Sequence, residues 1–195
     1  MAKQKKDLRP LIVENAQLIF SKCGLKKTTM EKIAASSSIA KSSIYYYFKS
    51  KEDIFEAVLE KEAQVFRATI NSTISKFDSP QDKIKYYVLT RMKMFQKLAN
   101  FYTAFKKEYI ENYAFISRIR KKYDTEEQTI IQDILTEGIQ HHNLMIKDTE
   151  LTSLAILTAM KGFELQWSVE KSIVDIEKDI DFLLEVLFYG LVKRT

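Results

Sequence analysis

Apolar residues recur every three or four positions along almost the whole chain, and this spacing is the strongest constraint on its fold. The longest stripe consists of Phe55, Leu59, Ala63, Phe66, Ile70, Ile74 and Phe77, the pattern of one buried helix face. No stretch alternates with period two for long enough to predict a strand. Only four Gly and two Pro interrupt the 195 residues, which suits long helices rather than a barrel or sandwich. The sequence predicts an all-α fold of about nine helices.

Capping residues set the expected helix ends. Asp7 can cap a first helix, which Gly24 would end. Thr28 and Glu31 have capping-box spacing for a short second helix, and a third runs from about Lys41 to Tyr47. Two further helices are predicted to begin at caps, one at Ser50 with Asp53 and one at Ser79-Pro80. A helix over about 101–117 is expected to stop at Lys121-Lys122, and another runs through Ile130 to His141. The last two are expected from Asp148 or Thr149 to about 171 and over about 176–192.

Several protein classes are disfavoured by what the sequence contains. One Cys, Cys23, excludes an internal disulfide framework and a multi-Cys zinc site. The N-terminus MAKQKKDLRP has no apolar stretch behind it, and the apolar run 182–192 contains Glu185 and is too short to span a bilayer. We expect a soluble cytoplasmic protein without a membrane segment.

The positive charge is concentrated at the N-terminus. Residues 1–51 carry eleven Lys and Arg against three acidic residues, a net charge of +8, whereas residues 52–195 carry −3. A basic head on an acidic body is typical of nucleic-acid binding. The alternative is a Lys-rich tail without function, since Lys3, Lys5, Lys6 and Arg9 supply four of the cations.

The stretch TTMEKIAASSSIAKSSIYYYFKSKED, residues 28–53, has the pattern of a helix-turn-helix. Ile33 and Ala34 face inward on its first helix, and Ile39 and Ile44 hold the second helix against it. That leaves Lys41, Ser42, Ser43 and Tyr45 at the exposed start of the second helix, where base edges are read. Successive helical residues point about 100° apart, so Tyr45, Tyr46 and Tyr47 cannot all be buried; one is expected in the core and two at the surface.

The run TTMEKIA…IAKSSIYYYFKSKEDIF, with Ala16, Leu18, Ile19, Phe20 and Gly24 before it, resembles the signature of TetR-type (tetracycline-repressor-like) transcriptional regulators. The resemblance covers about residues 10–58. It implies that Thr29 gives its N–H or hydroxyl to a phosphate, and that Lys41, Ser42, Ser43 and Tyr45 enter the major groove. It further implies that Tyr47 and Lys51 bind flanking phosphate, that Tyr46 can touch the backbone, and that Phe48 is core.

Two positions depart from that family pattern. Ser38 stands where the family usually has the turn glycine, so if the turn needs a positive φ, Ser38 costs about 1 kcal/mol. Ala40 stands where a capping Ser or Thr is common, which would lose about 0.5–2 kcal/mol of capping energy unless Ser37 or Ser38 caps instead.

The body is expected to form a dimer and a ligand pocket. The helices over 148–171 and 176–192 carry more apolar surface than one monomer core needs, so they are the candidates for a homodimer interface, as in the similar family; burial within one monomer is the alternative. The resemblance also implies an effector site, and large residues in the middle of the chain could line a mostly apolar pocket. The candidates are Phe66, Arg91, Met94, Phe95, Phe105, Tyr109, Tyr113, Met160, Phe163 and Trp167. The alternative is that they are ordinary core.

No catalytic constellation, phosphate loop or metal-binding spacing is found, so neither an enzyme nor a cofactor is expected. Residues 1–50 are predicted to be the helix-turn-helix DNA-binding domain, and residues 51–195 the ligand-binding and dimerisation domain. The predicted function is a ligand-responsive transcriptional regulator, a repressor by family expectation, that binds a palindromic operator in double-stranded DNA and is released by a small lipophilic effector. The alternative is a ligand-independent DNA-binding interaction protein; an all-α enzyme or lipid carrier is a third, disfavoured reading.

Overall fold

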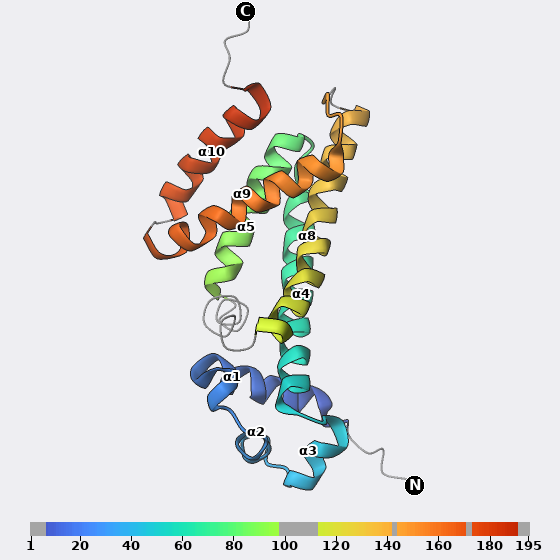
Figure 1. Ribbon diagram of the computed structural model, residues 1–195, viewed down its shortest axis with the longest axis vertical. Helices are drawn as coiled ribbons and strands as arrows, with labels where there is room; N and C mark the ends of the chain where they lie inside the picture. The colour runs from blue at the N-terminus through green and yellow to red at the C-terminus, as the bar shows by residue number, and fades with distance from the viewer. Residues whose placement is uncertain (1–6, 98–112, 142–143, 171–172, 191–195) are drawn as a thin grey trace, which may run out of the picture. The chain divides into compact units, whose positions relative to one another are not determined.

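The computed structural model describes residues 7–97, 113–141, 144–170 and 173–190. Within these ranges it contains eight helices and no strand (Figure 1), which confirms the all-α prediction. The helices are α1 (Arg9–Lys27), α2 (Met30–Ser36), α3 (Lys41–Tyr47), α4 (Lys51–Ile74), α5 (Pro80–Lys97), α8 (Tyr113–His141), α9 (Thr149–Glu170) and α10 (Ile173–Tyr189). Most of the helix predicted over 101–117 lies outside the described residues.

Most predicted caps are confirmed by hydrogen bonds. The Asp53 N–H donates to Ser50 Oγ at 3.1 Å at the start of α4, and the Asp82 N–H donates to Ser79 Oγ at 3.0 Å at the start of α5, where Pro80 is the first helical residue. At α9 the Leu151 N–H donates to Asp148 Oδ1 at 2.9 Å, so Asp148 is the cap. These side chains satisfy amides that have no partner inside the helix.

Several helix boundaries differ from the prediction. α8 runs through Lys121 and Lys122 without a stop, because lysine is a good helix former and no cap interrupts it there. α4 ends at Ile74 rather than Phe77, whose ring instead stacks on Tyr86 at 4.0 Å. α10 ends at Tyr189, because Gly190 adopts φ 79°, a left-handed conformation that stops a helix.

The described residues divide into two compact units. The first holds the described parts of Met1–Gln64 and Leu98–Arg120, and the second those of Val65–Lys97 and Lys121–Thr195. The first unit therefore extends beyond residue 50 to include the start of α4. We call them the head unit and the body unit below.

The head unit is built around aromatic and branched side chains from α1 to α4. Ile12, Ala16, Ile33, Ile44 and Ile54 are fully buried. The Phe20 and Phe55 rings meet edge to face at 4.9 Å, an arrangement that favours aromatic pairs. Gly24 has φ 73° near the end of α1, as the sequence predicts for a helix C-terminus, and a further helical turn follows it.

In the body unit α5 packs along α10 and also contacts α9. Its core includes Ile70, Ile84, Ile131, Ile134 and Leu135. Ion pairs join neighbouring helices, with N···O distances of 2.6 Å between Arg67 and Glu126, 2.6 Å between Lys83 and Glu137, and 2.7 Å between Lys85 and Asp181. Apolar packing therefore holds the body unit together. The ion pairs join α8 to α4 and α5, and α10 to α5.

Candidate nucleic-acid interface

The turn between α2 and α3 is closed by a Schellman motif with a serine in place of glycine. Ser38 has φ 54°, the positive φ that makes this position costly for serine. The Ser38 N–H donates to Ala35 O and the Ile39 N–H to Ala34 O, both at 3.1 Å. These two bonds satisfy the last carbonyls of α2 and direct the chain into α3.

α3 begins without a side-chain cap, as the sequence predicts. Ala40 is the N-cap residue and its side chain makes no capping hydrogen bond, while its carbonyl accepts from the Ser43 N–H at 2.9 Å. Ser37 cannot compensate, since its hydroxyl is buried without a hydrogen-bond partner among the described residues. The first amides of α3 are thus left free of side-chain acceptors.

Two buried side chains hold α3 in the head unit. Ile44 is 0% exposed and Phe48, which follows the helix, is 4% exposed. The Arg9 guanidinium lies over the Phe48 ring at 5.0 Å, and cation–π attraction adds to this packing. The predicted core position of Phe48 is confirmed, and its burial turns the opposite face of α3 outward.

That outward face carries the predicted DNA-contacting residues. Lys41, Ser42, Tyr45 and Tyr46 are exposed, and Ser43 and Tyr47 are half-buried. Tyr46 and Tyr47 meet edge to face at 5.1 Å. The expectation that one tyrosine is core is wrong: Tyr47 is only half-buried, because Ile44 and Phe48 fill the contact between α3 and the rest of the head unit.

The two threonines before α2 have separate tasks. Thr29 is the N-cap residue and its hydroxyl accepts from the Lys32 N–H at 3.3 Å, whereas Thr28 is fully buried and its hydroxyl donates to Gly24 O at 2.7 Å. The predicted cap at Thr28 is therefore wrong by one residue, because the end of α1 uses the Thr28 hydroxyl. Thr29 is exposed, as a phosphate contact requires.

Lys51 has its ammonium group directed at the end of α1. Nζ donates to the carbonyls of Leu25, Lys26 and Thr28 at 2.8, 3.3 and 3.2 Å. These three bonds use all the donors of an ammonium group. Lys51 thus ties the start of α4 to the end of α1, and the phosphate contact implied by the family requires it to exchange one of these partners.

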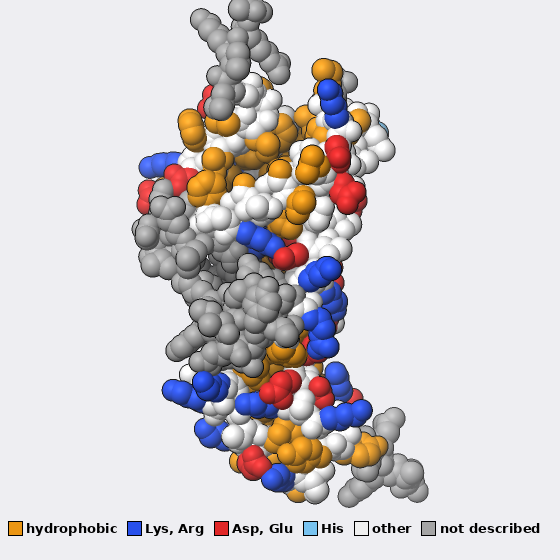
Figure 2. Space-filling model, in the orientation of Figure 1, with side chains coloured by type: hydrophobic (Ala, Val, Ile, Leu, Met, Phe, Trp, Pro, Cys, Tyr) orange, Lys and Arg blue, Asp and Glu red, His pale blue; other side chains and the backbone are white. Residues whose placement is uncertain are grey.

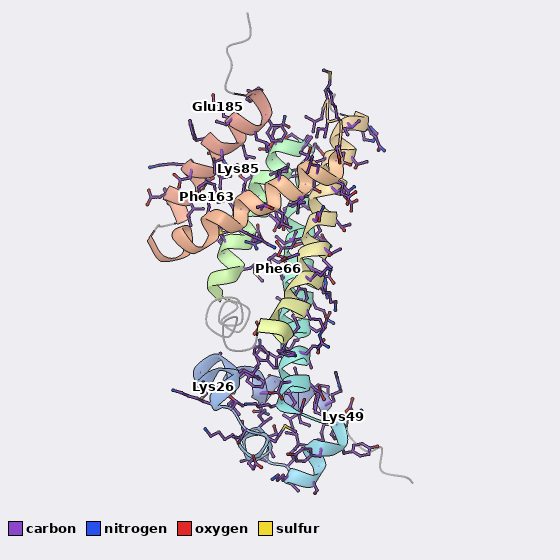
Figure 3. All side chains as sticks on the ribbon, viewed as in Figure 1. Lys26, Lys49, Phe66, Lys85, Phe163 and Glu185 are labelled. Atoms are coloured by element: carbon purple, nitrogen blue, oxygen red, sulfur yellow. The ribbon has the colours of Figure 1, made fainter. Side chains whose placement is uncertain are left out.

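Sequence reasoning missed two features of this surface. Lys41 pairs with Glu31 of α2, Nζ to Oε1 at 2.5 Å, and this contact lowers the pKa of Glu31 and raises that of Lys41. Lys26 is an exposed cation that was missed, and its position next to the helix-turn-helix in the sequence was a signal for it. Lys49, in the basic stretch after the recognition helix that the sequence already marks as suited to phosphate, is exposed on another side of the head unit (Figure 3). Figure 2 shows further Lys and Arg side chains on the head unit, which suits a phosphate-binding surface.

The body unit contains an apolar groove of about 450 Å³ between α5, α9 and α10, here called the α9–α10 groove. An adjoining hollow of about 390 Å³ shares Thr152, Ile156 and Leu187 with it. The groove is lined by Ile84, Val88, Leu151, Thr152, Ala155, Ile156, Ala159, Met160, Phe163, Ile180, Leu183, Leu184, Val186 and Leu187. Both volumes fall within the usual range of ligand sites, about 300–1,000 Å³.

The predicted pocket residues are only partly brought together. Met160 and Phe163 line the groove, whereas Phe66 and Met94 are buried and line neither the groove nor the adjoining hollow. Phe105 and Tyr109, and the side chains of Phe95, Tyr113 and Trp167, lie outside the described part of the structure. The α5 and α10 lining residues were missed, although Ile180, Leu183 and Leu187 recur at helical spacing in the sequence and were a signal for the α10 side.

Arg91 is part of a buried charge network. Its side chain is 2% exposed, and Nε donates to Glu127 Oε2 at 2.5 Å. The Tyr87 hydroxyl donates to the same oxygen at 2.6 Å, and burial, followed by the nearby Glu127 charge, raises the pKa of Tyr87 well above its ordinary value. Arg91 thus has an acidic partner within the body unit and is not among the residues that line the groove.

α9 and α10 expose a large amount of apolar surface, which Figure 2 shows over this part of the body unit. Six large apolar side chains on the two helices are at least 46% exposed: Leu151, Leu154, Val174, Phe182, Leu187 and Tyr189. Exposed apolar surface of this extent is typical of a protein or ligand contact.

Two further searches cover the described residues alone. None of their helices combines the length and the apolarity needed to cross a membrane. Likewise, His, Cys, Asp and Glu side chains form no group of three that could hold a metal ion in the described ranges.

Comparison with known proteins agrees with the head geometry. The family profile of "Bacterial regulatory proteins, tetR family" matches residues 12–58. The fatty acid metabolism regulator protein of Bacillus subtilis is 25% identical over 97% of this chain and 98% of its own length. The biofilm operon negative transcriptional regulator IcaR of Staphylococcus aureus is 28% identical over 65% of this chain and 63% of its own.

The fold is also that of a solved regulator. The crystal structure of FadR from Bacillus subtilis in complex with stearoyl-CoA superposes with a TM-score of 0.70, at 23% identity, over 94% of this chain and 99% of that one. These relatives are transcriptional regulators rather than enzymes. The family match lies over the helix-turn-helix described above, so residues 12–58 carry the sequence that characterises the TetR family of bacterial transcriptional regulators.

Proposed function

We propose that the chain regulates transcription by inserting α3 into the DNA major groove, and that it acts as a homodimer released by a small apolar effector. The observation that supports this proposal is the outward face of α3. Lys41, Ser42 and Tyr45 are exposed on it, while Ile44 and Phe48 are buried against the rest of the head unit. A rigid helix that presents small and aromatic side chains with one cation is suited to reading base edges.

A charge placed on this face tests the DNA contact. Ser42→Glu puts a carboxylate against the phosphates, so we expect binding to duplex DNA to fall more than about tenfold. Ser72→Glu, an equal change at an exposed position of α4 in the body unit, is the matched control and should change binding less than about twofold. Equal effects of the two variants would count against α3 as the contact.

The dimer is proposed through α9 and α10. Six of their large apolar side chains stay exposed in the body unit, and a two-fold pair of such faces would bury each other. A symmetric dimer presents two α3 helices, so it would read a palindromic operator with two half-sites. Phe182→Glu should yield monomers in sedimentation equilibrium, whereas Val65→Glu, on an exposed apolar residue of α4, should not. A dimeric Phe182→Glu variant would argue against this face.

The effector is proposed to be a molecule with a long apolar chain, with an acyl-CoA as the first candidate. The α9–α10 groove has no charged lining residue, and its single polar one, Thr152, already donates its hydroxyl to Asp148 O at 2.7 Å. The name of the fatty acid metabolism regulator protein of Bacillus subtilis, and the stearoyl-CoA bound in the FadR structure from the same organism, support this chemistry. The buried Arg91–Glu127 pair argues against Arg91 as the site of an anionic head group.

Stearoyl-CoA should therefore raise the melting temperature, and free CoA should not. Ala159→Trp fills the groove and should abolish the shift. The absence of any shift with stearoyl-CoA would favour the second candidate, a DNA-binding protein without an effector. The burial of Phe66 and Met94 in the core, outside the α9–α10 groove and its adjoining hollow, is the observation that favours that candidate.

Effector binding is proposed to act on DNA binding through α4. This helix starts in the head unit at Lys51 and ends in the body unit at Ile74, so both units share it. A 100-fold change in operator affinity corresponds to a coupling free energy of about 2.7 kcal/mol, which is in the usual allosteric range. Operator should weaken effector binding by the same factor. Repression is the expected direction, as in the negative regulator of Staphylococcus aureus, and the cytoplasm is the expected compartment.

A further inference from the structure

One acidic residue interrupts the basic segment that contains the helix-turn-helix. Between Glu14 and Glu52 the chain has seven lysines, and Glu31 is its single acidic residue. Its carboxylate is not turned away from the proposed DNA surface. It pairs with Lys41, the first residue of α3, at an Nζ to Oε1 distance of 2.5 Å. The one negative charge of this segment therefore neutralises a cation proposed to face DNA.

From this contact we infer that Glu31 is an internal competitor of DNA: its carboxylate occupies Lys41 in the free protein and must be replaced by DNA when α3 enters the groove. The inference rests on the proposed function, because it assigns a regulatory part to the same surface. Thr29, the other proposed phosphate contact at this end of α2, lies two residues before Glu31 and is exposed. A carboxylate paired with the Lys41 ammonium group takes the place of a phosphate oxygen.

The exposure of the pair makes this exchange feasible. The two side chains are 58% and 56% exposed, so water and salt screen their attraction and the pair is weak. A duplex presents many phosphates at once and can displace one weak partner. The remaining carboxylate then lies close to a polyanion and is repelled by it. Both effects lower affinity for every sequence alike, since neither involves a base edge.

Charge removal at Glu31 provides the test. Binding of the full chain to a pool of random duplexes is measured for wild type, Glu31→Gln, Lys41→Gln and the double variant, at several salt concentrations. Glu31→Gln should tighten binding by about two- to tenfold at low salt, with a smaller gain at high salt. Lys41→Gln should weaken binding, and Glu31→Gln should tighten binding less in the Lys41→Gln background than in wild type, because only the repulsion between Glu31 and DNA is then left to remove.

Glu14→Gln is the matched control. Glu14 is an exposed residue of α1 in the same unit, and its removal changes the net charge equally. Equal tightening in Glu14→Gln and Glu31→Gln would mean a general charge effect and would overturn the inference. Weaker binding of Glu31→Gln would also overturn it, since Glu31 would then hold Lys41 in its productive position. Thermal unfolding of each variant checks that the head unit is intact.

Failure of the proposed function has a different signature. If Lys41→Gln leaves binding unchanged with either residue at position 31, and Ser42→Glu is also without effect, α3 does not contact DNA. If both of those variants weaken binding while Glu31→Gln matches wild type, α3 contacts DNA and Glu31 is not a competitor. The two failures are therefore separated by the same set of measurements.

Discussion

Replacing Ser38 by glycine should stabilise the helix-turn-helix. Ser38 has φ 54°, a conformation that costs an L-residue about 1–2 kcal/mol and costs glycine almost nothing. Glycine also raises the conformational entropy of the unfolded chain, which reduces the gain in folding stability by about 0.4–1 kcal/mol. The expected net gain for Ser38→Gly is about 0.5–1 kcal/mol.

Hydrogen exchange at the turn measures this gain locally. The Ile39 amide donates to Ala34 O and is protected only while the Schellman motif is closed. A gain of that size should slow its exchange by about two- to fivefold. Ser36→Gly is the control, because Ser36 is the last residue of α2 and has helical backbone, where glycine is unfavourable. Exchange in Ser38→Gly that is as fast as in wild type, or as fast as in Ser36→Gly, would refute the strain argument.

Four more outcomes are expected. Arg91→Ala leaves Glu127 buried without its cation and should cost about 3–5 kcal/mol in urea unfolding, whereas Arg118→Ala, from a pair that is mostly exposed, should cost under about 1 kcal/mol. Gly138→Ala brings a methyl group against Leu144 Cδ1 and to 2.9 Å from Pro80 Cγ, so it should lower stability by about 1–2 kcal/mol. A stabilised variant would show that both contacts relax. Lys51→Ala should weaken binding to all duplexes and flatten the dependence of log binding constant on log salt concentration by about one unit. An unchanged slope would mean that Lys51 contacts the carbonyls at the end of α1 and no phosphate. Tyr45→Ala should alter the ranking of bound sequences in a competition assay, and uniform weakening would contradict base reading.

The helices were predictable because each depends on local signals. The stripe from Phe55 to Ile74 follows the period of α4, and Ser79-Pro80 carries its own cap and first-turn residue. The positive φ at Ser38 and the missing cap at Ala40 could be predicted for the same reason, since each concerns one backbone position.

Tertiary partners account for what the sequence did not predict. Thr28 has a capping sequence, but the end of α1 takes its hydroxyl, which no local rule anticipates. From the sequence alone, Arg91 could serve as an anion site. The fold brings Glu127, which lies 36 residues later in the chain, into contact with it. The pairing of Lys41 with Glu31 and the use of Lys51 on α1 carbonyls likewise depend on how separate helices meet.

Selection of bound sequences from random duplex DNA at about physiological salt tests the central claim most directly. A homodimer that reads bases through α3 should recover a palindrome with two half-sites, their centres about one helical turn, 34–36 Å, or a multiple of it apart. Recovery of no preferred sequence, with salt-sensitive binding to every duplex, would contradict the account. It would leave a protein that binds the phosphate backbone alone, and the Ser38 and Ala40 departures would be the first features to change.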